Sequence, residues 1–270
     1  MPTYPDNSVN SDVAISQGGD RLMFQRDGRM LGGNALSTRF ELRWIAGQRG
    51  KPSINADINS ATEAVREIAD PDFEVLGTNG TSALSTYNVE GGIKFTTAGA
   101  SADQMILLPH LDANQSPWAQ VTWGSDQETI WECHIKTGSA ITSTTIWAGL
   151  KLTNTSVTAT DADQCFFRYA AATNSGKWEA VSSIADTDVA TDTGVLAVLS
   201  TEYRFRIAID SARQARMLMA AGANGAMTFI KTTAALTNAT DFIPYIGVQA
   251  DTGAAKHFLI FGQAISRKFA

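Results

Sequence analysis

Few side chains in this sequence have the types and spacings that perform chemistry. There are three histidines: His110, His134 and His257. None of them forms an i, i+4 pair of the kind that binds zinc on a helix, and no Cys-x-x-Cys occurs. His134 alternates with Glu132 and Lys136 along an expected strand, which indicates a surface histidine. There is no nucleophile-elbow serine, phosphate-binding glycine loop or kinase signature, and the isolated pair Gly32-Gly33 indicates a plain turn.

Two acidic stretches, Asp161–Asp163 and Asp186–Asp192, have the spacing of some calcium ligands. Both lack the glycine and the terminal glutamate of a hand-type calcium loop, so we interpret them as turn residues, with a bound cation as the alternative. A glycosidase would need two carboxylates about 5 to 10 Å apart in a groove. Asp126, Glu128 and Glu132 are close in sequence, but Glu128 and Glu132 would lie about 13 Å apart along one strand. The sequence therefore predicts no catalytic residue, no cofactor and no metal site.

Aromatic residues raise the question of sugar stacking. The chain has six tryptophans: Trp44, Trp118, Trp123, Trp131, Trp147 and Trp178. Trp147 is out of phase with Ile146 and Ala148, so it faces either solvent or a second layer of structure. Packing in a core or an interface is the simpler interpretation, and a glycan platform is the alternative. Cys133 and Cys165 stand in strand-like runs and are expected to be buried free thiols.

Composition narrows the function classes further. The 270 residues are 44% hydrophobic and only 18% charged, against roughly 25% charged in an ordinary soluble domain. Such a chain can bury a large core and still present small neutral polar residues to partners. The net charge of −6 argues against nucleic-acid binding and against a basic membrane-surface helix. The sequence shows no signal peptide and no apolar run of about 18 residues, so we expect synthesis in a cytoplasm without export.

Downstream of Pro71 the hydrophobic pattern has mostly period two, which is typical of strands. The expected strands cover residues 73–76, 91–97, 104–109, 119–123, 129–137, 144–152, 164–169, 178–184, 203–210, 215–220, 227–231, 243–249 and 256–267. In 129–137, Trp131, Cys133 and Ile135 are expected to point inward. In 203–210, the inward set starts at Tyr203, and Arg204 and Arg206 face out. So many short strands with almost no helix predict an all-β antiparallel sandwich or barrel.

The first 58 residues have the pattern of an extended arm. Asp27-Gly28 between apolar runs predicts a β-hairpin, and Ser60–Glu63 is a capping box for one short helix over 61–69. We therefore expect an arm (1–58), a helical linker (59–71) and a sandwich domain (72–270). The apolar face of the arm is more than a lone hairpin can hide, so we expect it to contact another chain. The partner-contact candidates are Phe24, Met30, Leu31, Phe40, Leu42 and Trp44.

Several weak motifs recur in a characteristic order in the second half of the chain: Trp131–Lys136, Trp147–Leu150, Asp163–Tyr169, Lys177–Val181, Asp192–Gly194, Tyr203–Asp210 and Pro244–Val248. On these motifs residues 129–265 resemble a concanavalin-A-like (laminin-G-like) sandwich of the type found in tailed-phage virion proteins. The resemblance implies a jelly-roll topology. One departure is the segment Ala221–Gly225, which stands where such proteins carry a Tyr/Ile-Asn-Gly turn. The metal-binding acids of legume lectins are not recognisable, which argues against carrying over their sugar site.

The resemblance and the arm together point to a non-enzymatic virion structural protein. The first hypothesis is a capsid decoration (cement) protein of a bacteriophage that binds the major capsid protein or copies of itself, as a homo-oligomer, through the arm. The alternative is a glycan-binding module on a tail or fibre, which needs an exposed aromatic and polar groove. A glycoside hydrolase or lyase would need a carboxylate pair that the sequence does not show. Neither nucleic acid nor membrane is an expected partner.

Overall fold

The computed structural model describes residues 73–81, 84–89, 91–109, 122–152 and 161–268, together with the backbone of five strands between residues 13 and 54. The named elements in this part of the chain are strands, apart from one 3-10 turn at Asn174–Gly176. The described residues contain no helix that is long and apolar enough to cross a membrane. The expected helix over 61–69 and the linker 59–71 lie outside the described residues.

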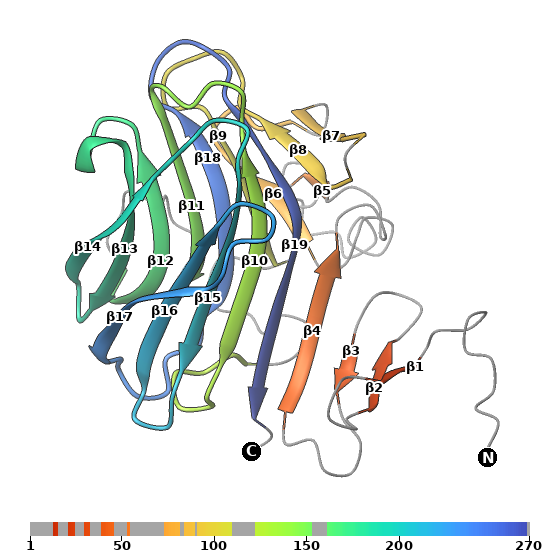
Figure 1. Cartoon of the computed structure of the whole chain (residues 1–270), viewed down its shortest axis with the longest axis vertical. Helices are drawn as coiled ribbons and strands as arrows, with labels where there is room; N and C mark the ends of the chain where they lie inside the picture. The colour runs from red at the N-terminus through yellow and green to blue at the C-terminus, as the bar shows by residue number, and fades with distance from the viewer. Residues whose placement is uncertain are drawn as a thin grey trace.

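One layer is an eight-stranded sheet that we call the front sheet (Figure 1). Its strands are β4 (Arg39–Ile45), β7 (Ser85–Tyr87), β8 (Ile93–Thr96), β10 (Ile130–Thr137), β15 (Glu202–Ile209), β16 (Gln214–Ala221), β17 (Thr228–Ala235) and β19 (His257–Lys268). The order is β17-β16-β15-β10-β19-β8-β7, and β4 pairs with β19 as well. The long strand β19 therefore carries two neighbours end to end on one edge. Its residues 257–260 pair with β8, and its residues 262–268 pair with β4.

The second layer, the back sheet, also has eight strands. They are β5 (Ser53–Ile54), β6 (Phe73–Leu76), β9 (Gln104–Pro109), β11 (Thr144–Lys151), β12 (Asp163–Ala170), β13 (Lys177–Ile184), β14 (Thr187–Leu196) and β18 (Ile243–Ala250). The order is β14-β13-β12-β11-β18-β9-β6-β5, antiparallel except for the parallel pair β5 and β6. The predicted all-β, antiparallel jelly-roll sandwich is confirmed.

A small third sheet precedes the sandwich. It consists of β1 (Val13–Ile15), β2 (Arg21–Phe24) and β3 (Met30–Gly32) in that order. Strands β2 and β3 pair with Phe24 opposite Met30, so the hairpin predicted around Asp27-Gly28 is present. The arm continues into β4, which joins the front sheet.

Period-two alternation places the core between the two sheets. In β10 and β15 every second residue is buried, and Trp131, Cys133, Ile135 and Tyr203 lie inward as the sequence predicts. The sheets meet through aromatic pairs, such as Phe167 of β12 stacked on Phe205 of β15 with ring centroids 4.7 Å apart. Each fully buried aromatic or aliphatic side chain contributes about 1.5–3 kcal/mol to folding, so this interior is the main source of stability.

The back sheet is buried on both faces around β11 and β18. Ile146 belongs to the main core, whereas its neighbour Trp147 packs in a second cluster on the opposite face, with Phe166 and Tyr245. Gly247 opposite Trp147 leaves room for the indole, because a Cβ there would lie 2.4 Å from its ring. The out-of-phase position of Trp147 thus reflects a second layer and not solvent exposure.

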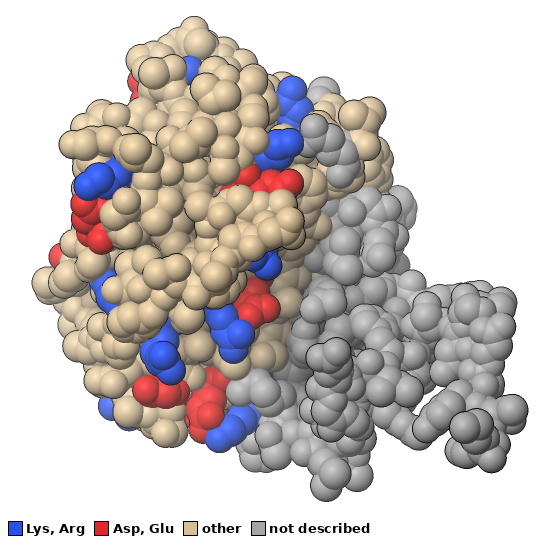
Figure 2. Space-filling view, in the orientation of Figure 1, with Lys and Arg blue, Asp and Glu red and all other residues tan. Residues whose placement is uncertain are grey.

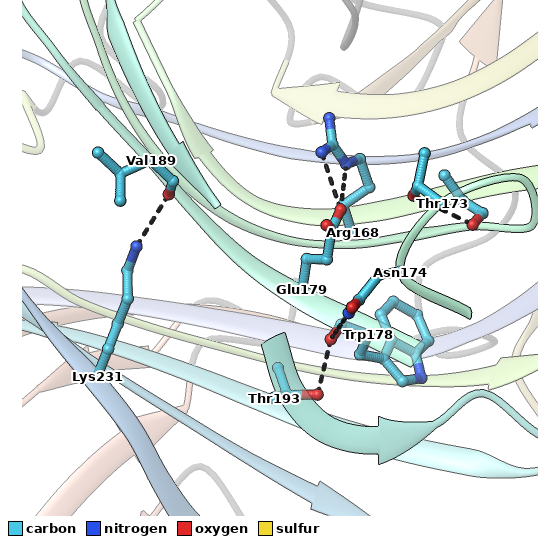
Figure 3. A network of polar contacts seen from close by, with 9 residues as sticks. Arg168, Thr173, Asn174, Trp178, Glu179, Val189, Thr193 and Lys231 are labelled. Atoms are coloured by element: carbon cyan, nitrogen blue, oxygen red, sulfur yellow. Dashed lines mark hydrogen bonds and ion pairs between the residues drawn. The ribbon is translucent and has the colours of Figure 1, made fainter. Parts of the chain in front are cut away.

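At one side of the sandwich, the edge strands β14 and β17 lie next to each other. Lys231 of β17 spans the two sheets, because its Nζ donates to the Val189 carbonyl oxygen of β14 (Figure 3). The same Nζ donates to Ser182 Oγ of β13 at 3.0 Å. Burial lowers the pKa of this lysine. The same view shows Arg168 and Glu179 paired across β12 and β13, with 2.8 Å between Nη2 and Oε2. The contacts of Lys231 therefore join the two sheets at this side of the sandwich.

Two expectations about individual strands were wrong. Asp188 and Asp192, interpreted as turn residues, lie within β14, an edge strand whose residues are exposed or half-buried and which therefore lacks a clear apolar alternation. Thr122 and Trp123, the described part of the strand expected over 119–123, are not in a strand. Trp123 is instead held in a loop, where its backbone N–H donates to Asp241 Oδ1 at 2.6 Å.

Candidate functional site

A groove of about 510 Å³ opens on the outer face of the front sheet. The side chains that shape it come from four places in the chain: Glu132 and His134 of β10, Arg204 of β15, Phe261 of β19, and Met227 from the loop between β16 and β17. Figure 2 is seen from the side of this sheet and shows basic and acidic side chains close together on it. It is a solvent-open site built from strands that are far apart in sequence.

A β-bulge in β19 turns Phe261 into this groove. The register against β10 pairs His134 with Gly262 and Ile135 with Ile260, so Phe261 is the extra residue. Ile260 and Gln263 both lie inward although they are three residues apart, which leaves Phe261 and Gly262 together on the outer side. A bulge commonly serves to re-aim a side chain in this way. The Phe261 ring lies 4.6 Å from the His134 ring, centroid to centroid.

A hydrogen-bonded pair and an ion pair lie on the outer face beside these two rings. His134 Nε2 lies 3.0 Å from Glu202 Oε2, and Arg206 Nη1 lies 3.0 Å from Glu132 Oε1. Both pairs join neighbouring strands, since β10 and β15 are adjacent, and both are partly exposed. Exposed pairs of this kind contribute little to stability, so they leave charged groups available to a ligand.

Arg204 has a different environment. One of its Nη2 donors is taken by the Gly225 carbonyl oxygen, and its buried Nε has no hydrogen-bond partner. Gly225 belongs to the segment Ala221–Gly225, where the sequence departs from the turn of the proteins that it resembles. This segment leads to Met227 at the groove, as Figure 1 shows for the loop that passes in front of β10 and β15. The turn therefore shapes one wall of the groove.

The charges on this face favour an anionic ligand. The outward residues of β8, β10, β15 and β16 include five bases and two acids: Lys94, Lys136, Arg204, Arg206, Arg216, Glu132 and Glu202. The whole chain, in contrast, has a net charge of −6. A basic face on an acidic protein creates a local potential that attracts anions.

The six partner-contact candidates from the sequence belong to strands of the arm, of which the structure describes the backbone. Phe24, Met30 and Leu31 belong to β2 and β3. Strand β4 pairs with β19 of its own chain, with Phe40 opposite Arg267, Leu42 opposite Ile265, and Trp44 opposite Gln263. The edge of β19 beyond β8 thus gives β4 a pairing partner within the same chain. The contact role of the six residues stays a prediction.

A glycan-stacking platform of tryptophans is wrong for the four tryptophans whose side chains the structure describes. Trp123, Trp131, Trp147 and Trp178 are all almost fully buried, at 1% exposure or less, so none can stack on a glycan. Core packing was the correct interpretation for these four. Trp44 and Trp118 have no described side chain.

Four of the acidic residues considered as ligands or catalysts form ion pairs or hydrogen bonds within the protein. Asp161 pairs with Lys151, Asp192 pairs with Lys177, and Glu128 contacts Lys268. Asp163 accepts from the Thr237 backbone N–H at 2.9 Å. Among the described residues no group of three or more His, Cys, Asp or Glu side chains could hold a metal ion. His110 lies outside the described residues, and burial, with Lys94 nearby, lowers the pKa of His257.

A second polar centre lies under the back sheet and is closed to solvent. Lys151 Nζ is 3.4 Å from Asp161 Oδ2, with side-chain exposures of 1% and 5%. The ammonium also lies 4.9 Å from the centre of the Tyr245 ring. Burial lowers the pKa of Lys151, and Asp161 acts in the opposite direction. Such an enclosed pair supports the packing of the second cluster and has no access to a substrate.

The sequence placed His134 and Arg204 on outer faces correctly but did not bring them together. The missing information was the adjacency of β10, β15 and β19, which depends on contacts between distant segments. Phe261 was missed because the bulge breaks the alternation. The three-residue interval between inward Ile260 and Gln263 is the signal that could have revealed it.

Comparisons with known proteins identify the fold. No protein-family model matches the chain, and no curated protein matches it. A protein of unknown function from Shewanella oneidensis MR-1 is similar in structure, with TM-score 0.55 and 13% identity over 87% of this chain and 89% of that one. Alginate lyase Aly36B gives TM-score 0.50 and 10% identity, covering 85% and 97%. Peanut lectin gives 0.46 and 9%, covering 85% and 97%. With this topology of two eight-stranded sheets, the chain is a β-sandwich of the concanavalin-A-like type.

Proposed function

We propose that this chain is a non-catalytic saccharide-binding module and that the groove on the front sheet is its binding face. The observation that carries the proposal is the half-buried Phe261 ring beside the hydrogen-bonding groups of His134, Arg204 and Glu132. An aromatic ring covers the apolar face of a sugar, and neighbouring polar groups bind its hydroxyls. A structural neighbour of TM-score 0.50 is an alginate lyase, and this likeness supports a polysaccharide as the ligand class.

The test is saccharide binding by the full chain on a glycan array, followed by titration calorimetry with the best ligand. Phe261→Ala should abolish binding because it removes the stacking surface. Phe229→Ala is the matched control: Phe229 is an exposed phenylalanine of the same sheet, on β17, that does not line the groove. Equal loss in both variants, or no binding by the unmodified protein, would refute the proposal.

The same experiment separates binding from catalysis. Bound polysaccharide should be recovered with its length unchanged and without new reducing ends or unsaturated products. Release of shortened chains that stops in His134→Gln would make this face an active site and replace the binding proposal.

A second proposal concerns attachment. We also propose, from the sequence, that the chain is part of a phage virion and that β1, β2 and β3 anchor it to the capsid. Two- and three-stranded sheets with little core are marginal alone, so a partner surface would stabilise this one. Deletion should stop at residue 36, because β4 belongs to the front sheet. Undiminished occupancy of assembled shells by the truncated protein would contradict the anchoring role.

A further inference from the structure

We infer that the ligand of the groove is a saccharide that carries carboxylate groups, and that Arg204 is the residue that recognises the carboxylate. The inference rests on the proposed function and specifies its ligand class. Its starting point is the imbalance of charge on the outer face of β8, β10, β15 and β16, where five bases accompany two acids.

Among the described residues that line the groove, Arg204 is a cation with no carboxylate partner, because both acids of this face are already paired. Glu202 is paired with His134, and Glu132 with Arg206. Within the described part of the chain, Arg204 contacts no carboxylate: Nη2 donates to the Gly225 carbonyl oxygen, and the buried Nε has no partner. A half-buried guanidinium that no carboxylate neutralises is an unfavourable arrangement in the free protein, and an anionic ligand in the groove would neutralise its charge.

The geometry of a guanidinium selects among anions. Its planar N–H donors match the two oxygens of a carboxylate in a bidentate pair, which is stronger than a bond between neutral groups. Phe261 and Met227 on the groove walls give the apolar surface that a sugar ring needs beside its charged group. The two acids on the same face disfavour a dense polyanion such as a nucleic acid, whose phosphates would be brought close to Glu132 and Glu202.

A comparison of ligands with different charged groups tests the ligand class on the unmodified protein. The probes are an oligogalacturonate, the same oligosaccharide as its methyl ester, and a heparin-type sulfated oligosaccharide, each titrated at low and high salt. The oligogalacturonate should bind about ten- to a hundredfold more tightly than its ester, the range expected for one charge-assisted pair. Its affinity should also fall as salt is added. Equal binding of acid and ester, or tighter binding of the sulfated probe, would overturn the inference.

Variants then test the role of Arg204. Arg204→Gln should lose the preference for the acid over the ester while keeping the weaker binding of the ester. Arg204→Lys keeps a point charge without the planar fork and should be intermediate. The control is Arg216→Gln, because Arg216 lies over the Phe229 ring, 5.7 Å from its centroid, away from the groove lining. An unchanged acid preference in Arg204→Gln would refute the role of Arg204.

The outcomes keep the two proposals apart. If neutral saccharides bind in the groove and acidic ones gain nothing, the binding function stands and the carboxylate inference fails. If no saccharide binds, both fail. If a variant does not fold, as judged by its urea unfolding midpoint, the comparison of acid and ester on the unmodified protein still decides the ligand class.

Discussion

Among the described residues, Lys151 and Asp161 form the most enclosed ion pair. Removing one partner of a buried ion pair leaves the other charge uncompensated, which typically costs about 3–5 kcal/mol. Lys151→Met should therefore lower the free energy of unfolding by about that amount, measured by urea denaturation at pH 7. The double variant Lys151→Met, Asp161→Leu should recover most of the loss, since no charge is then left buried. A single variant as stable as the unmodified protein would show that the pair contributes nothing.

His257 makes stability depend on pH. Burial and the nearby Lys94 lower its pKa in the folded state, and its Nε2 accepts from the Ser139 backbone N–H at 3.4 Å, which requires an unprotonated nitrogen. The unfolded chain takes up the proton near pH 6.5, but the folded chain does so only at lower pH. The free energy of unfolding should therefore fall as pH decreases below about 6.5.

The His257→Gln variant isolates this contribution from the other histidines. Urea unfolding of both proteins at pH 7.5 and 5.5 should show a smaller decline in the variant. An identical decline in both proteins would assign the pH dependence to other groups.

At the scale of the element, the bulge of β19 can be removed without disturbing the faces of the strand. Deleting Phe261 leaves Ile260 and Gln263 inward, now two residues apart, so the protein should fold with a loss of about 1–3 kcal/mol and lose saccharide binding. Circular dichroism measures whether the variant folds, urea unfolding measures its stability, and calorimetry measures saccharide binding.

Deleting Ala264 is the matched control for this prediction. That deletion lies within the regular ladder and moves Ile265, a fully buried residue, to the solvent face. It should prevent folding. If both deletions are tolerated equally, the bulge does not have the role described above.

At the scale of the whole molecule, we expect the two sheets of the sandwich to unfold together. Burial raises the pKa of the Cys133 thiol well above its usual value and that of Cys165 to about 12, so neither forms a reactive thiolate in the folded state. Cys133 lies on the front sheet and Cys165 on the back sheet. Both should react with an aromatic disulfide reagent at pH 8 at the same slow rate, which rises with urea as global unfolding does.

Each of the single variants Cys133→Ser and Cys165→Ser keeps one thiol, so its labelling rate measures the opening of one sheet. Fast labelling of one thiol at low urea would show that its sheet opens independently.

Sequence predicted the sandwich because alternation is a local property. Trp131, Cys133 and Ile135 show it within one strand, and their burial follows directly. Edge strand β14 was missed because both of its faces contact solvent to some extent: Asp188 and Val189 are both exposed, so the order of polar and apolar residues does not follow burial. The local pattern therefore identifies strands that border the core and fails at the rim.

The groove could not be predicted because it depends on which strands are neighbours. His134, Arg204 and Phe261 lie on three strands that meet only through long-range pairing. The pairing of β4 with β19 has the same character, since it joins segments near the two ends of the sequence. Nothing within Arg39–Ile45 distinguishes a strand that completes its own sheet from one that reaches another molecule.

The pairing of β4 with β19 makes the sandwich a candidate for circular permutation. Arg39 stands directly opposite Lys268 in an antiparallel ladder, so a tight turn of a few residues could link the end of β19 to the start of β4 as an ordinary hairpin. New termini could then be opened in the exposed turn around Ser139 and Ala140, between β10 and β11. The rearranged gene would encode the strands of the two large sheets, from β4 onwards, in a different order and without β1, β2 and β3.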